Sequence, residues 1–372
     1  MATINQKMGL LRGLLSGEVA KAGPFYVDID VTQRCNLRCV GCPFHGPHVK
    51  RETQTSSVGV DIPLDLFKKL CVELKSMKTN SLIIQGSGEP LLNPDIFEMI
   101  STAKDAGFSI TLLTNGTLLN SDTIKALIDV RLDILRVSLW ASSVEQYRKN
   151  YPGNDPDNFR KVIDGLNRVT KLKAQQKSTL PTTLIYYIIN HYNFQTINEM
   201  VDLAVTTGCD GLYFTPMFNV RGELTSFMLS PEEGQLFQLA LCRARKRLKS
   251  LSMSHNFNWA LSRYKMTDKA LWEHLPCYIA WFHVRISTDG RVLPCGRCND
   301  NIYFGNLHEN TLQEIWNGPL IREFRRKAFS KKEFESIVGK NCNCKMCCYF
   351  RDSESIHQVF KWINPFVRLL KS

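Results

Sequence analysis

Three cysteines near the start of the chain have a spacing that suits an incomplete metal site. Cys35, Cys39 and Cys42 stand in the order C-x3-C-x2-C. Structural zinc sites and electron-carrying iron–sulfur clusters normally take four protein ligands. Three thiolates leave one iron of a 4Fe-4S cluster open to a further ligand. We therefore predict a cluster with one free coordination position, with three plain thiols or half of a zinc site as the alternative.

The cysteines follow a predicted strand, and the chain beyond them alternates between strands and helices. The pattern predicts strands at 25–31, 81–85, 109–113, 134–139, 183–189 and 211–214, and helices at 63–77, 94–106, 121–129, 156–173 and 194–207. Strands that alternate with helices form a parallel sheet with right-handed crossovers. We therefore predict an α/β fold, a partial (β/α)6 TIM-like barrel, with its chemistry on loops at the carboxyl ends of the strands.

The cysteine motif resembles the signature of the radical SAM superfamily, because Asn36 follows the first cysteine and Pro43 follows the third. The resemblance implies that the free iron binds S-adenosylmethionine (SAM) and that an electron from the cluster cleaves it. The resulting 5'-deoxyadenosyl radical would take hydrogen from a substrate, which is chemistry that belongs mainly to the cofactor.

Residues at the ends of the later strands are consistent with the same family. The run Gly86-Ser87-Gly88-Glu89-Pro90 resembles the GGEP motif that receives the SAM amino group, although an ordinary Gly-Pro turn is the alternative. Trp140 departs from the family, where an acidic residue is frequent, so we expect an aromatic wall or core packing there. The resemblance implies these SAM-binding residues: Gly86, Ser87, Gly88, Glu89, Asn115, Ser138 and Asn190.

A second group of cysteines lies near the end of the chain. Cys277 is followed by Gly290 and Cys295, with a hairpin predicted around an Asp-Gly turn at 286–292. Together with the later phrases GNL and EIWNG, this order resembles the C-terminal, cysteine-rich α+β SPASM/twitch domain of radical SAM enzymes. The resemblance implies one auxiliary 4Fe-4S cluster; a zinc site on the same thiolates is the alternative. The implied ligands are Cys277, Cys295, Cys344 and Cys347, which leaves Cys298, Cys342 and Cys348 as spares.

Composition sets wider limits. The chain has 372 residues, 13 cysteines and a formal net charge of +12. No signal peptide or membrane-spanning run is evident, so we expect a cytoplasmic protein whose cysteines bind metal or stay free, without a disulfide framework. The positive charge favours anionic partners, but we find no nucleic-acid-binding signature.

The pattern also suggests an order of segments. We expect an amphipathic helix within 1–24, the radical SAM core at 25–230, a helical connection at 231–276, the auxiliary cluster domain at 277–350 and a basic amphipathic helix within 351–372. The two terminal helices are expected to pack on the protein, with a weak contact to an anionic membrane surface as the alternative.

Together these features predict an enzyme that dehydrogenates or epimerises a small anionic, sugar- or phosphate-like molecule. Epimerisation needs a thiol hydrogen donor, for which Cys298 is the candidate. Maturation of a peptide is the alternative, although only 34 residues precede Cys35, too few for a leader-binding domain or a cobalamin domain. A non-enzymatic iron–sulfur or zinc scaffold is the alternative of another class. A low-potential electron donor such as ferredoxin or flavodoxin would reduce the cluster.

Overall fold

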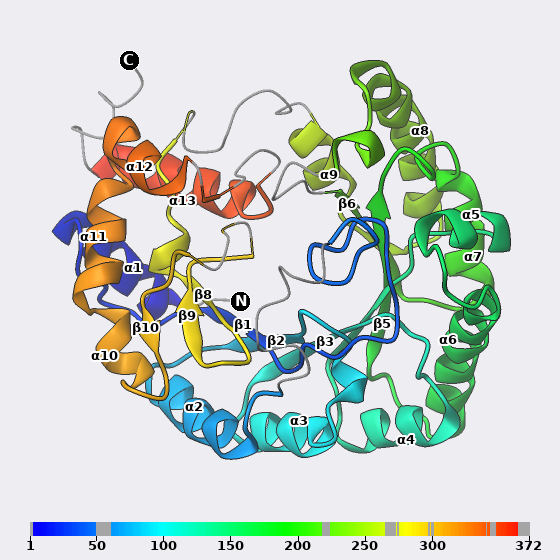
Figure 1. The fold of residues 1–372 in the computed structure, drawn as a ribbon, viewed down its shortest axis with the longest axis horizontal. Coiled ribbons are helices and arrows are strands. Elements are labelled where there is room, and N and C mark those ends of the chain that lie inside the picture. The colour runs from blue at the N-terminus through cyan, green and yellow to red at the C-terminus, as the bar shows by residue number, and fades with distance from the viewer. Residues whose placement is uncertain are drawn as a thin grey trace.

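The computed structural model describes residues 3–49, 61–217, 224–264, 273, 275–296, 298, 301–339, 341–342 and 347–363. Its strands form one sheet in the order β10-β9-β8-β1-β2-β3-β4-β5-β6-β7. The sheet curves around an inner face, and helices cover its outer face (Figure 1). Strands β1 to β6 run parallel to their neighbours, which confirms the predicted α/β fold.

The six predicted strands are all present, within two residues of the expected ends. Four further strands were expected only in part, as the Asp-Gly hairpin. The strands are β1 Tyr26–Asp30, β2 Ser81–Gln85, β3 Ser109–Thr114, β4 Ile134–Ser138, β5 Thr182–Ile189, β6 Gly211–Pro216, β7 Ser254–His255, β8 His283–Ile286, β9 Arg291–Leu293 and β10 Gly305–Asn306.

The helices that cover the sheet are mostly those predicted, but α5, α9, α11 and α12 were not. The bounds are α1 Ile4–Ser16, α2 Leu64–Ser76, α3 Ile96–Asp105, α4 Ser121–Asp129, α5 Val144–Asn150, α6 Asp157–Gln175, α7 Ile197–Thr206, α8 Pro231–Ser250, α9 Phe257–Tyr264, α10 Leu312–Trp316, α11 Pro319–Lys327, α12 Lys331–Val338 and α13 Phe350–Ile363. Short 3-10 turns lie at Pro90–Leu92, Thr225–Phe227 and Ile279–Trp281. The terminal helix expected within 351–372 begins at Phe350, and residues beyond 363 lie outside the described part of the chain.

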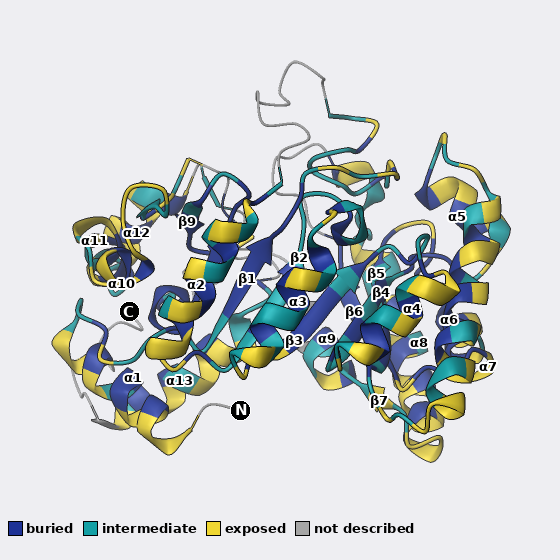
Figure 2. Cartoon of the chain, turned by 90° about the horizontal axis from the view of Figure 1, so that it is seen from below, coloured by how far each residue is buried: buried dark blue, intermediate teal, exposed yellow. Residues whose placement is uncertain are grey.

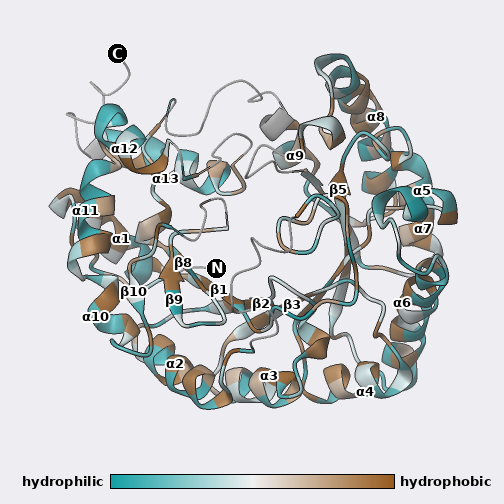
Figure 3. Ribbon diagram, viewed as in Figure 1, coloured by the Kyte–Doolittle hydropathy of each residue, from teal (hydrophilic) through white to brown (hydrophobic). Residues whose placement is uncertain are grey.

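Side chains alternate between the two faces of each strand. Val27 and Ile29 of β1 are fully buried against the helices, whereas Asp28 and Asp30 point to the inner face. The strands form the buried layer in Figure 2, and Figure 3 shows apolar stretches on them while the outer helices mix apolar and polar segments. The sheet therefore presents its polar groups inward, where the loops after the strands also gather.

The C-terminal region joins the same sheet, which the sequence did not predict. Strand β8 pairs in parallel with β1, and β9 and β10 extend the sheet as antiparallel strands. The EIWNG sequence, residues 314–318, binds this region to the N-terminal segment. The Trp316 indole donates to the Ala22 carbonyl at 2.7 Å, and the Asn317 amide bonds to both backbone groups of Ala20. No helix in the described part of the chain is both long and apolar enough to cross a membrane.

Candidate functional site

The cysteine loop begins directly after β1 and lies over the inner face of the sheet. Cys35, Cys39 and Cys42 are all partly buried. The Val40 N–H donates to the Asn150 carbonyl at 2.9 Å, which ties the loop to the end of α5. Gly41 lies so close to Met217, at the end of β6, that a Cβ would fall 2.6 Å from the Met217 methyl carbon. The loop that carries the three thiols is therefore held by contacts to the end of α5 and to the residue after β6.

The loop after β2 supports the cysteine loop at very short range. The N–H groups of Gly88 and Glu89 donate to the carbonyls of Thr32 and Arg34, at 3.1 and 2.7 Å. A Cβ on Gly86 would lie 2.7 Å from the Thr32 oxygen, and one on Gly88 would lie 2.1 Å from the Arg34 oxygen. Glycine is required at both positions because the backbone of the cysteine loop occupies the space of a side chain.

Glu89 binds the loops after β2 and β3 together. Its buried carboxylate accepts hydrogen bonds from the Thr114 hydroxyl at 2.6 Å, the Asn115 N–H at 2.6 Å and the Leu91 N–H at 3.1 Å. Burial raises the pKa of Glu89 to about 7, against the lowering effect of these donors. A carboxylate has about four acceptor positions, so one is left for the predicted SAM ammonium.

Asn115 and Ser138 lie on the same side as the cysteine loop. The Asn115 amide donates to the Asn36 side chain at 2.8 Å, next to Cys35. The Ser138 hydroxyl accepts the Trp140 indole N–H at 2.8 Å. Trp140 is buried and lies against Gly41, so it packs in the core beside the cysteine loop, and its role as an aromatic wall stays a prediction. The contacts of Asn115 and Ser138 with SAM stay predictions.

Asn190 lies deeper than the other predicted SAM-binding residues. It is fully buried, and its amide donates to the Asn150 side chain at 2.7 Å. Its side-chain oxygen accepts the Tyr192 N–H at 2.8 Å. These bonds fix the end of β5 against α5, and the SAM contact of Asn190 stays a prediction.

The cysteine loop offers the donors that an iron–sulfur cluster needs. Backbone N–H groups point at two of the sulfurs, from Leu37 to Cys35 at 3.5 Å and from Phe44 and His45 to Cys42 at 3.4 and 3.2 Å. Hydrogen bonds of this kind stabilise cluster thiolates. Burial raises the pKa of Cys35 to about 12, so its thiol ionises only when a cation such as iron is bound. The chemistry of this donor set fits a 4Fe-4S cluster.

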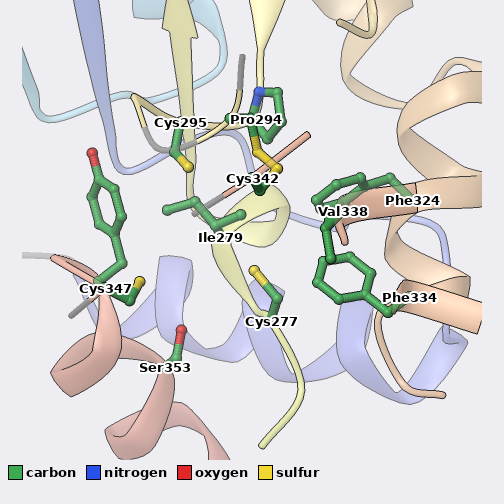
Figure 4. Close-up of a pocket in the computed structure, with 12 residues that line it drawn as sticks. Cys277, Ile279, Pro294, Cys295, Phe324, Phe334, Val338, Cys342, Cys347 and Ser353 are labelled. Atoms are coloured by element: carbon green, nitrogen blue, oxygen red, sulfur yellow. A yellow bond between two sulfur atoms is a disulfide. The ribbon is translucent and has the colours of Figure 1, made fainter. Parts of the chain in front are cut away.

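A second group of sulfurs lines an apolar cavity in the C-terminal region. Cys277, Cys295 and Cys347 converge there from three separate segments, beside Ile279 and Phe334 (Figure 4). Burial, followed by the neighbouring Cys295 thiol, raises the pKa of Cys277 to about 12. Among the described residues no three His, Cys, Asp or Glu side chains are arranged to hold a metal ion as they stand. A cluster lies between its thiolates and separates them more than a single ion does, so a set of soft donors around an apolar cavity fits it.

Two of the predicted spare cysteines also belong to this cavity. Cys298 and Cys342 line it and are joined in a disulfide. The expectation that the cysteines bind metal or stay free is therefore corrected at this pair, and Cys298 has no thiol hydrogen to donate while the bond is present. Cys344, the predicted fourth ligand, lies outside the described residues.

A set of buried polar residues between the two sulfur groups was missed by the sequence reading. Arg285 of β8 forms an ion pair with Asp30 of β1, and Ser87 donates to the same carboxylate at 3.2 Å. Two residues earlier in β1, the Asp28 carboxylate accepts a hydrogen bond from the Tyr349 hydroxyl at 3.2 Å. The alternation Tyr26-Val27-Asp28-Ile29-Asp30 in a buried strand was the available signal, because carboxylates there need partners.

Models of known protein families match the regions that contain the two sulfur groups. The family model described as radical SAM superfamily matches residues 29–204, and the model of an iron–sulfur cluster-binding SPASM domain matches residues 277–353. An AdoMet-dependent heme synthase of Methanosarcina barkeri is 27% identical over 88% of this chain and 89% of its own length. A PqqA peptide cyclase of Gluconobacter oxydans is 26% identical over 87% of this chain and 86% of its own length.

Solved structures show the same fold. Streptococcus suis SuiB bound to S-adenosylmethionine superposes with a TM-score of 0.63 at 18% identity, over 85% of this chain and 71% of SuiB. Native anSMEcpe with bound AdoMet superposes with a TM-score of 0.62 at 18% identity, over 94% of this chain and 99% of its own. The chain thus belongs to the radical SAM superfamily, and its C-terminal region is an iron–sulfur cluster-binding SPASM domain.

Proposed function

We propose that this radical SAM enzyme removes a hydrogen atom from its substrate and then oxidises the resulting substrate radical. The SPASM region would accept the electron that this oxidation releases. The supporting observation is that the two sulfur groups are attached to a pair of neighbouring strands, β1 and β8. In the sequence, β1 leads into the cysteine loop, and β8 lies between Cys277 and Cys295. When bound, SAM and the clusters supply the radical chemistry and the path for electrons. The residues of the chain bind, orient and shield these groups.

The proposed roles follow from the contacts described above. Cys35, Cys39 and Cys42 would hold the SAM-binding cluster, and the remaining acceptor position of the Glu89 carboxylate would receive the SAM ammonium. Asn115 fixes the cysteine loop through Asn36. Cys277, Cys295 and Cys347 would hold the auxiliary cluster in an apolar cavity. Dehydrogenation suits this arrangement, because a substrate radical that loses an electron to the auxiliary cluster and a proton to solvent becomes a carbonyl or an alkene.

Peptide maturation is the second candidate, favoured by the similarity to two PqqA peptide cyclases at 24% and 26% identity. A peptide and a small molecule make different demands on the enzyme. A peptide must present one side chain to the inner face while its backbone lies outside, whereas a small molecule enters completely. Cross-linking of a candidate peptide at several positions along its length would support peptide maturation, and a single small ligand that protects the inner face would support the first proposal.

The direct test uses anaerobically reconstituted and reduced protein. We expect it to convert SAM to 5'-deoxyadenosine and methionine, and Glu89→Ala to weaken SAM binding while keeping both clusters. Arg160→Gln, a change at an exposed side chain on α6, is the matched control. Unchanged SAM affinity in the Glu89 variant would show that the ammonium site lies elsewhere.

Dehydrogenation and epimerisation are separated by the fate of the second hydrogen. Dehydrogenation predicts a product two hydrogens lighter than the substrate, and loss of that product when Cys347 is replaced by alanine. Epimerisation predicts a product of unchanged mass with one solvent deuterium at an inverted carbon when the reaction runs in heavy water. That second result would refute the proposed oxidation.

A further inference from the structure

Arg136 lies in the middle of β4 and points to the inner face of the sheet. Its neighbours Leu135 and Val137 are fully buried, and Val137 lies against Gly116, with Val162 of α6 beyond. Because side chains alternate along a strand, Arg136 points away from these helices. Ser138, two residues further on, faces the same side and reaches Trp140, which lies against the cysteine loop. Arg136 is therefore on the face where the cysteine loop and the predicted SAM site lie.

The guanidinium of Arg136 is partly buried and has no hydrogen-bond or ion-pair partner among the residues that the structure describes. Its Nε is buried without a hydrogen bond, and no carboxylate in the described part of the chain forms an ion pair with it. Its direct neighbours on the adjoining strands are Leu113 and Leu184. A cation beside apolar side chains is costly unless an anion pairs with it.

The two aspartates of β1 on this face each lie beside a partner from the C-terminal region. Asp30 is bound to Arg285, and Asp28 is bound by His283 at 3.3 Å and by the Tyr349 hydroxyl. These bonds come from β8 and from the loop before α13, on the opposite side of the inner face from β4. Arg136 is thus set apart from the fixed ion pairs of the enzyme.

The depth of Arg136 separates it from the predicted SAM contacts. Ser138 ends β4, at the level of the loops, and Arg136 stands two residues earlier in the strand. Two strand residues span about 7 Å. An anion bound to Arg136 would therefore lie further into the inner face than the residues predicted to contact SAM.

We propose that Arg136 anchors an anionic group of the substrate, a carboxylate or a phosphate, beneath the SAM site. The proposal rests on the function proposed above and adds the chemical class of the substrate to it. Arginine suits this role because its planar guanidinium can donate two parallel hydrogen bonds to either group. The anion would also remove the cost of leaving the guanidinium unpaired.

The test measures binding of two probes, inorganic phosphate and glutarate, to the reconstituted protein by calorimetry with SAM present. Arg136→Gln should weaken the binding of the preferred probe by about tenfold or more, because hydrogen bonds to a charged group are lost. The affinity of Arg136→Lys for the probe should lie between those of the parent and Arg136→Gln, because lysine keeps the charge but cannot donate two parallel hydrogen bonds. The exposed Arg160→Gln is the matched control and should bind as the parent does. A preference for either probe supports the anchor and identifies the chemistry.

Three results would overturn the proposal. The first is equal probe binding by the Arg136 and Arg160 variants, or no probe binding by the parent. The second is weaker SAM binding in Arg136→Gln, which would assign the guanidinium to the SAM carboxylate. The third is a lower melting temperature for Arg136→Met without any anion, because loss of an unpaired cation should not destabilise the protein. Cleavage of SAM by the parent without substrate is measured in parallel, so that failure of the proposed function is seen separately.

Discussion

The two sulfur groups of the molecule are held in different ways. Cys35, Cys39 and Cys42 lie within eight residues on one loop, which is fixed by backbone hydrogen bonds to the loops after neighbouring strands. The cysteines of the second group come from segments up to 70 residues apart and meet only because β8, α11, α12 and α13 pack together. The first site depends on local geometry, whereas the second depends on the fold of a whole region.

The largest contrast is expected from single cysteine changes. Cys39→Ala should reduce SAM cleavage to background, because the cluster that delivers the electron is lost. Cys277→Ala should leave some SAM cleavage but destabilise the C-terminal region, because its metal and its packing are coupled. Quantifying 5'-deoxyadenosine and the melting temperature for both variants tests this. Equal cleavage by the two variants would remove the distinction between the sites.

The ion pair between Asp30 and Arg285 joins the two regions, and breaking it should cost nearly as much as a core mutation. Arg285→Met leaves a buried carboxylate unpaired, for which we expect a loss of about 3–5 kcal/mol in the free energy of unfolding. The double variant Asp30→Leu with Arg285→Met should recover most of that loss. Denaturant unfolding of the single and double variants measures both. A single variant as stable as the parent would show that the pair does not hold the regions together.

A smaller effect is expected from the titration of Glu89, within the first region. Burial raises its pKa to about 7 from 4.5, so the folded protein binds this proton more tightly than the unfolded chain does. The free energy of unfolding should therefore fall by roughly 3 kcal/mol as the pH rises from about 4.5 to about 7, and then level off. Glu89→Gln lacks this proton and should lack this part of the slope. Parallel slopes for the two apoproteins would contradict the buried carboxylate.

The smallest effect concerns the disulfide in the second region. Cys298 and Cys342 should resist alkylation until a reductant is added, while Cys242, which is exposed, should react at once. Mass spectrometry of alkylated peptides, before and after reduction, distinguishes them. Immediate labelling of Cys298 would restore it as a candidate thiol donor.

What could be predicted from the sequence follows the same contrast. The spacing of Cys35, Cys39 and Cys42 and the alternation of strands and helices were sufficient for the first region, because both are local patterns. The contact of Arg285 with Asp30 joins residues 255 apart in the sequence. The pairing of β8 with β1 is similarly remote, and no local pattern specifies either. The sequence predicted that Gly86 and Gly88 lie close to a ligand. In the structure, the backbone of the cysteine loop occupies the space that a side chain at either position would need.

The most direct test of the account is the iron content of three anaerobically reconstituted proteins. If both sulfur groups hold 4Fe-4S clusters, the parent should bind about eight irons per chain. The variant with Cys35, Cys39 and Cys42 changed to alanine should bind about four, and so should the variant that lacks Cys277 and Cys347. A parent chain with about four irons and one zinc would contradict the claim of two clusters.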